Sequence, residues 1–267
     1  MLNYTNHWNI WRFAGPPHQE QKLDPKDCKT LLRQGGLLVR NTYDFDCQEK
    51  TGFWNLIKDH FGGLEELTSK TRNRINKAFD NLEFRQIDFS EIKEHGYPIL
   101  KATYEDYAVS DRKMNFDVFD DLLQQYNGQN YDYWGVFDKT NGQLIGFQVI
   151  SLWDSSCEYT LVGILPQYKR NQTFPYYGLF YSINQYYLQE KGFRYITDGT
   201  RSITEHSNIQ DFLIEKFNFR KSYCRLAIYY RWWLKLAVKM LYPFRKIISL
   251  PRIKAVLNME AMQRGEK

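Results

Sequence analysis

The second half of the chain carries an ordered series of strand and helix patterns, and this order limits the fold more than any other feature. Two β-rich runs, 133–137 and 143–152, flank Asn141-Gly142, a dipeptide that favours the tight turn of a β-hairpin. A strand over 158–165, a loop over 166–177 and a helix over 178–191 follow. The patterns then predict a strand over 194–197, a helix over 208–217 and a strand over 223–230. The order predicts an α/β protein with a mixed sheet.

The first half carries shorter patterns. Two apolar runs around an acidic turn predict a hairpin or short sheet over 36–57, and a basic run capped by Thr68 or Ser69 predicts a helix over 69–79. A strand over 83–87 and amphipathic helices over 92–107 and 116–126 are predicted next. We therefore divide the chain into an N-terminal lobe with a connecting helix, a central domain and a C-terminal tail, over 1–82, 83–230 and 231–267.

Several classes of protein are excluded by simple observations. A chain of 267 residues buries a core without disulfide or metal support. The cysteines stand far apart and have no histidine at ligand spacing, so neither a disulfide nor a metal site is expected at Cys28, Cys47, Cys157 or Cys224. Residues 1–11 lack the pattern of a secretory signal, and no uncharged stretch reaches the ~18–20 residues that span a bilayer. We expect a cytoplasmic protein.

The charge is unevenly distributed. Residues 221–267 carry +9 and residues 1–220 carry −4, and no acid occurs between Arg225 and Met259. Arg231, Lys235 and Lys239 recur every four residues, which places them on one face of a helix that Pro243 ends. Either this helix lies in the plane of an anionic membrane surface, through residues 231–254, or it docks on the protein's own core with a solvated basic stripe.

Several short motifs resemble those of the GNAT acyltransferase superfamily, over about 83–230. A strand-opening G-x-x-I-G lies at 142–146, and a strand-to-loop P-x-Y-R lies at 165–170. A helix end lies at 190–193, and a segment similar to N…E-K-x-G-F lies at 208–219. Residues 53–58 and 67–78 are similar to the segment before the second GNAT lobe of Fem-type aminoacyltransferases and their polysaccharide-cluster relatives. The resemblance implies a GNAT-like fold with a partial N-terminal lobe and a basic helical tail.

The resemblance also implies an acyl donor, acetyl-CoA or another acyl-CoA, whose pantetheine lies in a cleft between two parallel strands. The residues that would hold it are Leu165, Lys169, Arg170, Tyr177 and Gly178. Two departures matter: Pro175 and Tyr177 stand where glycines cradle the pyrophosphate, and Ile214 stands where a tyrosine general acid is usual. Either the cradle begins at Gly178 or the donor differs.

Fem-type relatives take their acyl group from aminoacyl-tRNA and lack the CoA loop. The basic stretches 70–77 and 225–254 would then meet phosphates of tRNA or of a lipid-linked sugar, although such residues are more often solvated helix faces.

The main cluster of candidate residues, from Asp198 to Asn208, follows the predicted strand 194–197, because α/β folds present side chains at the ends of such strands. Glu158, early in the strand before the predicted loop, and Tyr177 are candidates outside this cluster. We assign His206 as general base, with Glu158 and Asp198 as further catalytic candidates. The candidates for substrate binding are Tyr177, Thr200, Arg201, Ser202 and Asn208. Five of these residues have a structural alternative. His206 is then a capping or exposed histidine, Glu158 a solvated strand end and Asn208 a helix N-cap. Arg201 is then paired with Asp198 or Glu205, and Tyr177 packs in the core.

The function implied is N-acyltransfer, of an acyl or aminoacyl group, to a small-molecule or lipid-linked amino sugar of a bacterial surface-polysaccharide precursor, at the inner membrane face. The alternative is a non-catalytic GNAT-like module that binds a glycan, a lipid-linked precursor or a partner protein.

Overall fold

The computed structural model describes residues 3–7, 9–20, 22–106, 114–203 and 208–266. The chain forms two compact units. The first unit comprises 1–56, 200–207 and 221–267, and the second comprises 57–199 and 208–220. Each is an α/β structure with a mixed sheet, as the order of sequence patterns predicted.

The sheet of the second unit contains β5 (Leu82–Ile87), β6 (Tyr131–Asp138), β7 (Leu144–Leu152), β8 (Ser156–Ile164) and β9 (Tyr195–Thr200). Neighbours from β5 to β8 pair antiparallel, and β8 pairs with β9 in parallel. The hairpin predicted at Asn141-Gly142 is confirmed: it joins β6 to β7, and Gly142 has a φ of 71°. Glycine adopts this left-handed conformation without steric cost.

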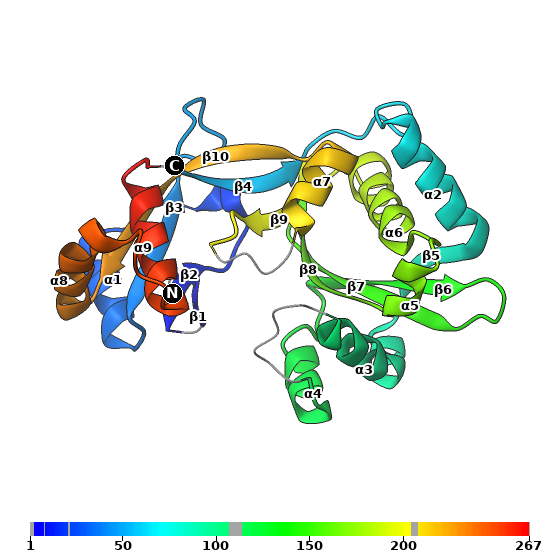
Figure 1. Ribbon diagram of the computed structural model, residues 1–267, viewed down its shortest axis with the longest axis horizontal. Coiled ribbons are helices and arrows are strands. Elements are labelled where there is room, and N and C mark those ends of the chain that lie inside the picture. Colours follow the sequence, from blue (N-terminus) through cyan, green and yellow to red (C-terminus); the bar gives the residue numbers. More distant parts are fainter. Residues whose placement is uncertain (1–2, 8, 21, 107–113, 204–207, 267) are drawn as a thin grey trace. The chain divides into compact units, whose positions relative to one another are not determined.

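Helices cover both faces of this sheet (Figure 1). The helices of the unit are α2 (Ser69–Asn81), α3 (Phe89–Glu105), α4 (Phe116–Gln124), α5 (Pro166–Arg170), α6 (Pro175–Asn184), a π-helical turn (Gln185–Glu190) and α7 (Ile209–Phe217). On one face α3 and α4 bury Ile92, Ile99 and Phe119 against Phe147 of β7. On the other, Phe180 of α6 packs on Tyr159 of β8 and Phe217 of α7.

Local sequence explains where these helices begin. The Thr68 hydroxyl accepts a hydrogen bond from the Thr71 N–H, which confirms the predicted cap of α2. The predicted loop 166–177 is wrong, because α5 occupies 166–170 and α6 begins at Pro175. Pro166 and Pro175 stand at the first helical position, where the missing N–H costs no hydrogen bond and the fixed φ suits the helix. Both prolines of the predicted loop therefore start helices.

The first unit contains β1 (Tyr4–His7), β2 (Ile10–Phe13), β3 (Leu38–Tyr43) and β10 (Arg220–Tyr230). β1 pairs with β2 and β10 with β3 in antiparallel fashion, whereas β2 and β3 are parallel. β4 (Phe53–Lys58) carries the chain from this unit into the other. β1 and β2 were not predicted, because each has only four residues.

The helices of the first unit are a 3-10 turn (Pro17–Gln19), α1 (Pro25–Arg33), α8 (Trp232–Leu241), a second 3-10 turn (Tyr242–Phe244) and α9 (Pro251–Gln263). The basic tail helix is confirmed as α8, and Pro243 follows its end. Val238 packs with Tyr242 and with Leu257 of α9. Among the helices described, none is long and apolar enough to cross a membrane.

Candidate functional site

The parallel strands β8 and β9 separate after a short stretch of pairing. Their register runs only from Ser156 opposite Tyr195 to Glu158 opposite Thr197, although β8 continues to Ile164. The register between β7 and β8 also shifts at Val149/Ile150, where a β-bulge bends a strand and increases its twist. The two strands therefore part beyond Glu158, as the resemblance implied.

Two carboxylates lie where the strands part. Glu158 is the last residue of β8 that pairs with β9, and Asp198 follows Thr197 on β9. Gly199 continues the strand with a φ of 77°, and its N–H donates to the Thr197 hydroxyl at 3.0 Å. A Cβ at position 199 would lie 3.0 Å from Glu158 Oε1, so the Glu158 carboxylate rests directly against the Gly199 backbone. Only glycine combines this backbone conformation with this close approach.

The environment of Asp198 changes its protonation. Burial and the negative charge of Glu158 raise the pKa of Asp198 to about 7, although a hydrogen bond from Gln210 of α7 lowers it. Both forms of the carboxyl group are then populated near neutral pH, which is the property that a general acid–base group needs. Asp198 is therefore the strongest candidate for proton transfer among the described residues.

A buried polar pair stands beside these carboxylates in the sequence. The Tyr159 hydroxyl donates to Asn184 Oδ1 of α6 at 2.8 Å. Burial raises the pKa of Tyr159 well above its ordinary value, so the phenol stays neutral. The Nδ2 group of Asn184 is buried and has no hydrogen-bond partner among the described residues. This amide nitrogen therefore retains both of its donor hydrogens.

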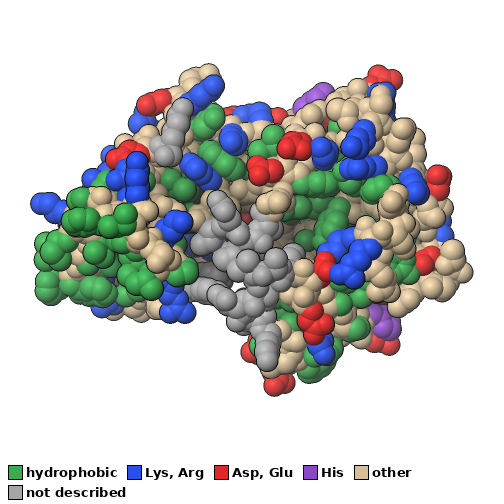
Figure 2. Space-filling model, in the orientation of Figure 1, with side chains coloured by type: hydrophobic (Ala, Val, Ile, Leu, Met, Phe, Trp, Pro, Cys, Tyr) green, Lys and Arg blue, Asp and Glu red, His purple; other side chains and the backbone are tan. Residues whose placement is uncertain are grey.

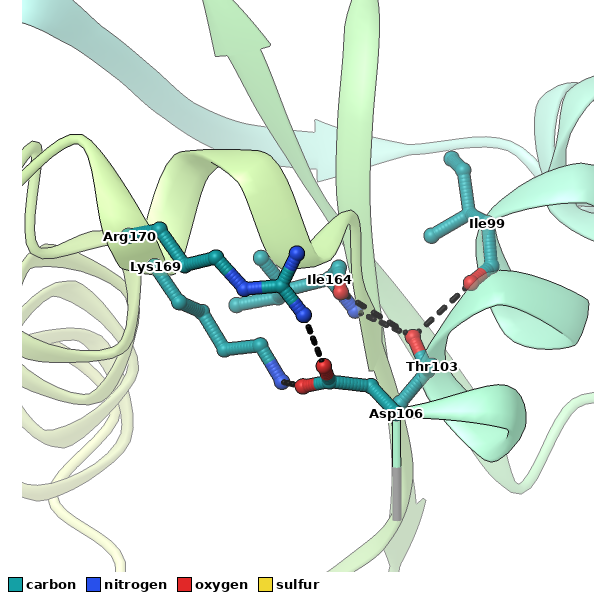
Figure 3. A network of polar contacts seen from close by, with 6 residues as sticks. All are labelled: Ile99, Thr103, Asp106, Ile164, Lys169 and Arg170. Atoms are coloured by element: carbon teal, nitrogen blue, oxygen red, sulfur yellow. Dashed lines mark hydrogen bonds and ion pairs between the residues drawn. The ribbon is translucent and has the colours of Figure 1, made fainter.

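Farther along β8, the backbone is held by α3 (Figure 3). Thr103 Oγ1 accepts a hydrogen bond from the Ile164 N–H at 3.0 Å and lies 3.1 Å from the Ile164 carbonyl oxygen. The same hydroxyl lies 2.8 Å from the Ile99 carbonyl oxygen. The Ile164 N–H therefore already has a partner within the protein.

The basic residues expected to bind CoA are engaged by an acid. Asp106, just after α3, accepts a hydrogen bond from Lys169 Nζ at 2.8 Å and forms a second ion pair with Arg170 (Figure 3). The hydrogen bond from Lys169 and the charges of both cations lower the pKa of Asp106. Lys169 and Arg170 thus tie α5 to the end of α3.

The start of α6 does not form a phosphate cradle. Pro175 has no N–H, the Tyr177 N–H donates to the Phe174 carbonyl, and a Cβ at Gly178 would lie 2.2 Å from Phe84 Cζ of β5. Gly178 therefore allows α6 to approach the sheet, and the Leu165 N–H is used by the Ile145 carbonyl. Four of the residues expected to hold CoA, Leu165, Lys169, Arg170 and Tyr177, therefore already have partners within the protein.

Other predicted binding residues are placed as follows. The Arg201 side chain donates to the Gly52 carbonyl at 2.7 Å, within the first unit, to which Thr200 and Ser202 also belong. Asn208 precedes α7 and is exposed, but its side chain makes no capping hydrogen bond. His206 and Glu205 lie outside the described residues.

Tyr177 is buried in the second unit. Its hydroxyl accepts a hydrogen bond from Arg74 of α2, and its ring packs against Phe212 and Phe217 of α7. These contacts agree with the core-packing alternative.

Sequence reasoning missed three residues that organise this region: Thr103, Asp106 and Gln210. Each is an ordinary polar residue on or just after a helix, and no local motif distinguishes it. Only the packing of α3 and α7 gives these side chains their partners.

A separate cavity of about 410 Å³ lies where β5 turns into α3. Arg85, Asp88, Glu91 and Asp132 are among its lining residues. Asp132 accepts hydrogen bonds from Tyr187 and Gln86. Neither Glu158 nor Asp198 lines this cavity, so it is distinct from the opening between β8 and β9.

Comparison with known proteins relates this architecture to solved structures. No protein-family model matches the sequence, and no curated protein matches it. The crystal structure of FemX superposes with a TM-score of 0.54 at 10% identity, over 80% of this chain and 78% of FemX. The chain has a FemX-like fold.

Two further structures support the FemX-like assignment. L-PGS from Bacillus licheniformis superposes with a TM-score of 0.51 at 12% identity, over 99% of this chain and 85% of that one. The C-terminal domain of a putative lysylphosphatidylglycerol synthetase from Agrobacterium fabrum gives a TM-score of 0.50 at 14% identity, over 84% and 78% of the two chains. At these identities the similarity concerns the fold.

Proposed function

We propose that this FemX-like protein is an N-acyltransferase that moves an aminoacyl or other acyl group to an amino group. The observation that carries the proposal is the pair Asp198 and Glu158 at the point where β8 leaves β9, with the pKa of Asp198 near 7. A carboxylate with this pKa accepts a proton from an attacking amine at neutral pH and returns it to the leaving group.

The proposed reaction balances with Asp198 alone as proton carrier. The amino nitrogen of the acceptor attacks the carbonyl carbon of the donor ester, a C–N bond forms and the C–O bond to the leaving group breaks. Asp198 takes one proton from the amine and gives it to the departing oxygen, so the products are an amide and an alcohol. The negative charge of Glu158 favours binding of the acceptor as an ammonium ion, which releases one proton to water before its neutral form attacks.

The donor we favour is an aminoacyl ester, as in aminoacyl-tRNA, rather than acyl-CoA. Thr103 already binds the Ile164 N–H, and Asp106 already pairs with Lys169 and Arg170, which were expected to hold CoA. The fold neighbours include a lysylphosphatidylglycerol synthetase domain, whose name denotes transfer of an aminoacyl group. Lys70 is exposed and Arg72 is half-buried on α2, where they can meet phosphates of a tRNA donor.

The acceptor we propose is an amino sugar of a surface-polysaccharide precursor, free or lipid-linked, on the cytoplasmic side of a membrane. It rests on the sequence resemblance to polysaccharide-cluster relatives. An amino sugar supplies the amine that the Asp198 mechanism requires.

The test uses the full chain with radiolabelled aminoacyl-tRNA, and separately acetyl-CoA, and a panel of free and nucleotide-linked amino sugars. We expect label transfer from aminoacyl-tRNA, with kcat at least ~100-fold lower for Asp198→Asn. Asp154→Asn is the matched control, because Asp154 is an exposed acid in the turn between β7 and β8. Equal activity of Asp198→Asn and Asp154→Asn would remove Asp198 from the mechanism.

A non-catalytic binding module is the second candidate, because Ile214 replaces the usual tyrosine acid and Pro175 and Tyr177 stand where the resemblance places glycines. Binding of an amino sugar or aminoacyl-tRNA without any transfer, under conditions where the melting temperature rises with ligand, would favour this candidate.

A further inference from the structure

Exposed apolar side chains are concentrated in one segment of the first unit. Among the described residues, ten large hydrophobic side chains are exposed, and eight of them lie between 232 and 250. We call these eight the apolar patch: Trp232, Trp233, Leu236, Met240, Leu241, Phe244, Ile247 and Leu250. Trp232 is 76% exposed and Ile247 is 79% exposed, so the patch is open to solvent. Contiguous exposed apolar surface of this kind marks an interaction site.

The helical periodicity of α8 explains how the patch forms. Leu234 and Val238 face the protein, where they pack with α9 and Tyr242. Trp232, Leu236 and Met240 recur every four residues on the face turned away from the protein. The helix therefore has a second apolar face that the first unit does not cover.

Positive charge accompanies this second face. Residues 231–254 contain seven Lys or Arg residues and no Asp or Glu. Lys235, Lys239 and Lys246 are exposed, and none of the three forms an ion pair within the described part of the chain. Figure 2 shows hydrophobic side chains gathered at the left of the view, over α8, with Lys and Arg side chains around them.

Not every cation of the segment is available. Arg231 donates to the carbonyls of Leu32 and Gly36, and Arg245 pairs with Glu266. These two residues attach the segment to the rest of the first unit. Lys235, Lys239 and Lys246 remain exposed and can contact a partner.

We propose that the apolar patch inserts into the interface of an anionic lipid bilayer, with α8 lying in the membrane plane. Tryptophan is suited to the headgroup level, and exposed lysines attract anionic lipids. A second copy of the chain fits less well, because a symmetric contact through this patch would bring lysines of both copies together without acids to balance them. The lipid surface supplies both the apolar layer and the opposite charge.

The test measures flotation of the full chain with vesicles of phosphatidylcholine and phosphatidylglycerol in about a 7:3 ratio. We expect binding that falls at least ~10-fold when the phosphatidylglycerol is omitted or when NaCl is raised to about 0.5 M, because the charge attraction is screened. Binding of equal strength to pure phosphatidylcholine would overturn the anionic part of the proposal.

Matched substitutions locate the contact. Leu236→Ser with Met240→Ser removes apolar area from the patch, and Phe116→Ser removes an exposed aromatic side chain of α4 in the other unit. We expect the double variant to lose at least ~10-fold in vesicle affinity, and Phe116→Ser to bind as the parent does. Circular dichroism establishes that each variant is folded. Equal binding by the folded double variant and the parent would overturn the proposal.

A direct readout uses the two tryptophans of the patch. Phosphatidylcholine brominated on its acyl chains should quench part of the fluorescence, and Trp232→Phe with Trp233→Phe should abolish this quenching while flotation persists. The other five tryptophans of the chain act as the internal control. Quenching that is unchanged in the double Phe variant would overturn the placement. A stable dimer in light scattering that Leu236→Ser with Met240→Ser dissociates would assign the patch to a second copy and overturn the membrane proposal.

Discussion

The Thr103 hydroxyl accepts a hydrogen bond from the Ile164 N–H at 3.0 Å and also contacts the Ile164 carbonyl. Thr103 lies in α3 and Ile164 at the end of β8, so one buried side chain completes the hydrogen bonding of a strand edge after β9 has turned away. In the absence of this hydroxyl, two buried backbone groups would lose their partner.

Thr103→Val tests this relationship. The valine keeps the shape but not the hydroxyl, and an unsatisfied buried group costs about 1–3 kcal/mol. We expect the free energy of unfolding in urea to fall by that amount. Thr103→Ser, which keeps the hydroxyl, should lose less than half as much; an equal loss in both variants would assign the effect to packing.

Gly199→Ala tests the contact between Glu158 and the β9 backbone. The added Cβ meets Glu158 Oε1 at 3.0 Å, and alanine is strained at a φ of 77°. The free energy of unfolding should fall by more than the ~1 kcal/mol that a left-handed alanine costs. Gly192→Ala is the matched control, since Gly192 has a φ of 66° and no atom within 4 Å of its added Cβ. Equal losses would show that Glu158 tolerates the methyl group.

Asp198→Asn should stabilise the protein in a pH-dependent way. The pKa of Asp198 is raised to about 7, so the native state holds a proton that the unfolded state releases above pH ~4. The parent therefore loses stability as pH rises from about 4 to 7, and the loss is complete above 7. We expect the melting temperature of Asp198→Asn to exceed that of the parent by at least ~3 °C at pH 8 and to match it near pH 4.

A different dependence of the melting temperature on pH would contradict this prediction. If the variant were stabilised equally at pH 4 and pH 8, the carboxyl group would have an ordinary pKa, and the stabilisation would have another cause. Calorimetry across pH 4, 6 and 8 distinguishes the two cases.

Gly178→Ala tests whether this glycine serves helix packing. A methyl group would lie 2.2 Å from Phe84 Cζ, so α6 cannot keep its distance from β5. Overpacking of this kind typically costs about 1–3 kcal/mol in unfolding free energy. Adding Phe84→Leu should restore part of the stability lost by Gly178→Ala. A variant as stable as the parent would show that the packing is looser than the structure indicates.

The fold was largely accessible from the sequence because its signals are local. The Asn141-Gly142 turn, the Thr68 cap and the period of α4 each depend on residues a few positions apart. The segment at 166–177 was misinterpreted because proline suits both a loop and the first turn of a helix. Only the packed neighbours of α5 and α6 distinguish the two.

The candidate site was accessible only in part. Glu158 and Asp198 were identified from their positions near the ends of predicted strands, whereas Gln210, Thr103 and Asp106 were not. Lys169 and Arg170 show the same limit, since their partner Asp106 lies more than 60 positions away in the sequence.

The sequence by itself determined the order of strands and helices, the hairpin turn and the basic helix of the tail, because short-range periodicity and turn chemistry encode these elements. It also determined that carboxylates lie near β-rich runs. Tertiary structure alone decided which of those groups have partners. Burial beside Glu158 moves the pKa of Asp198 to about 7, and Asp106 pairs with Lys169 and Arg170, the cations expected to hold CoA. Trp232, Leu236 and Met240 remain uncovered although Leu234 and Val238 of the same helix are packed. Such effects depend on distances between groups remote in the chain, and periodicity carries no information about those distances.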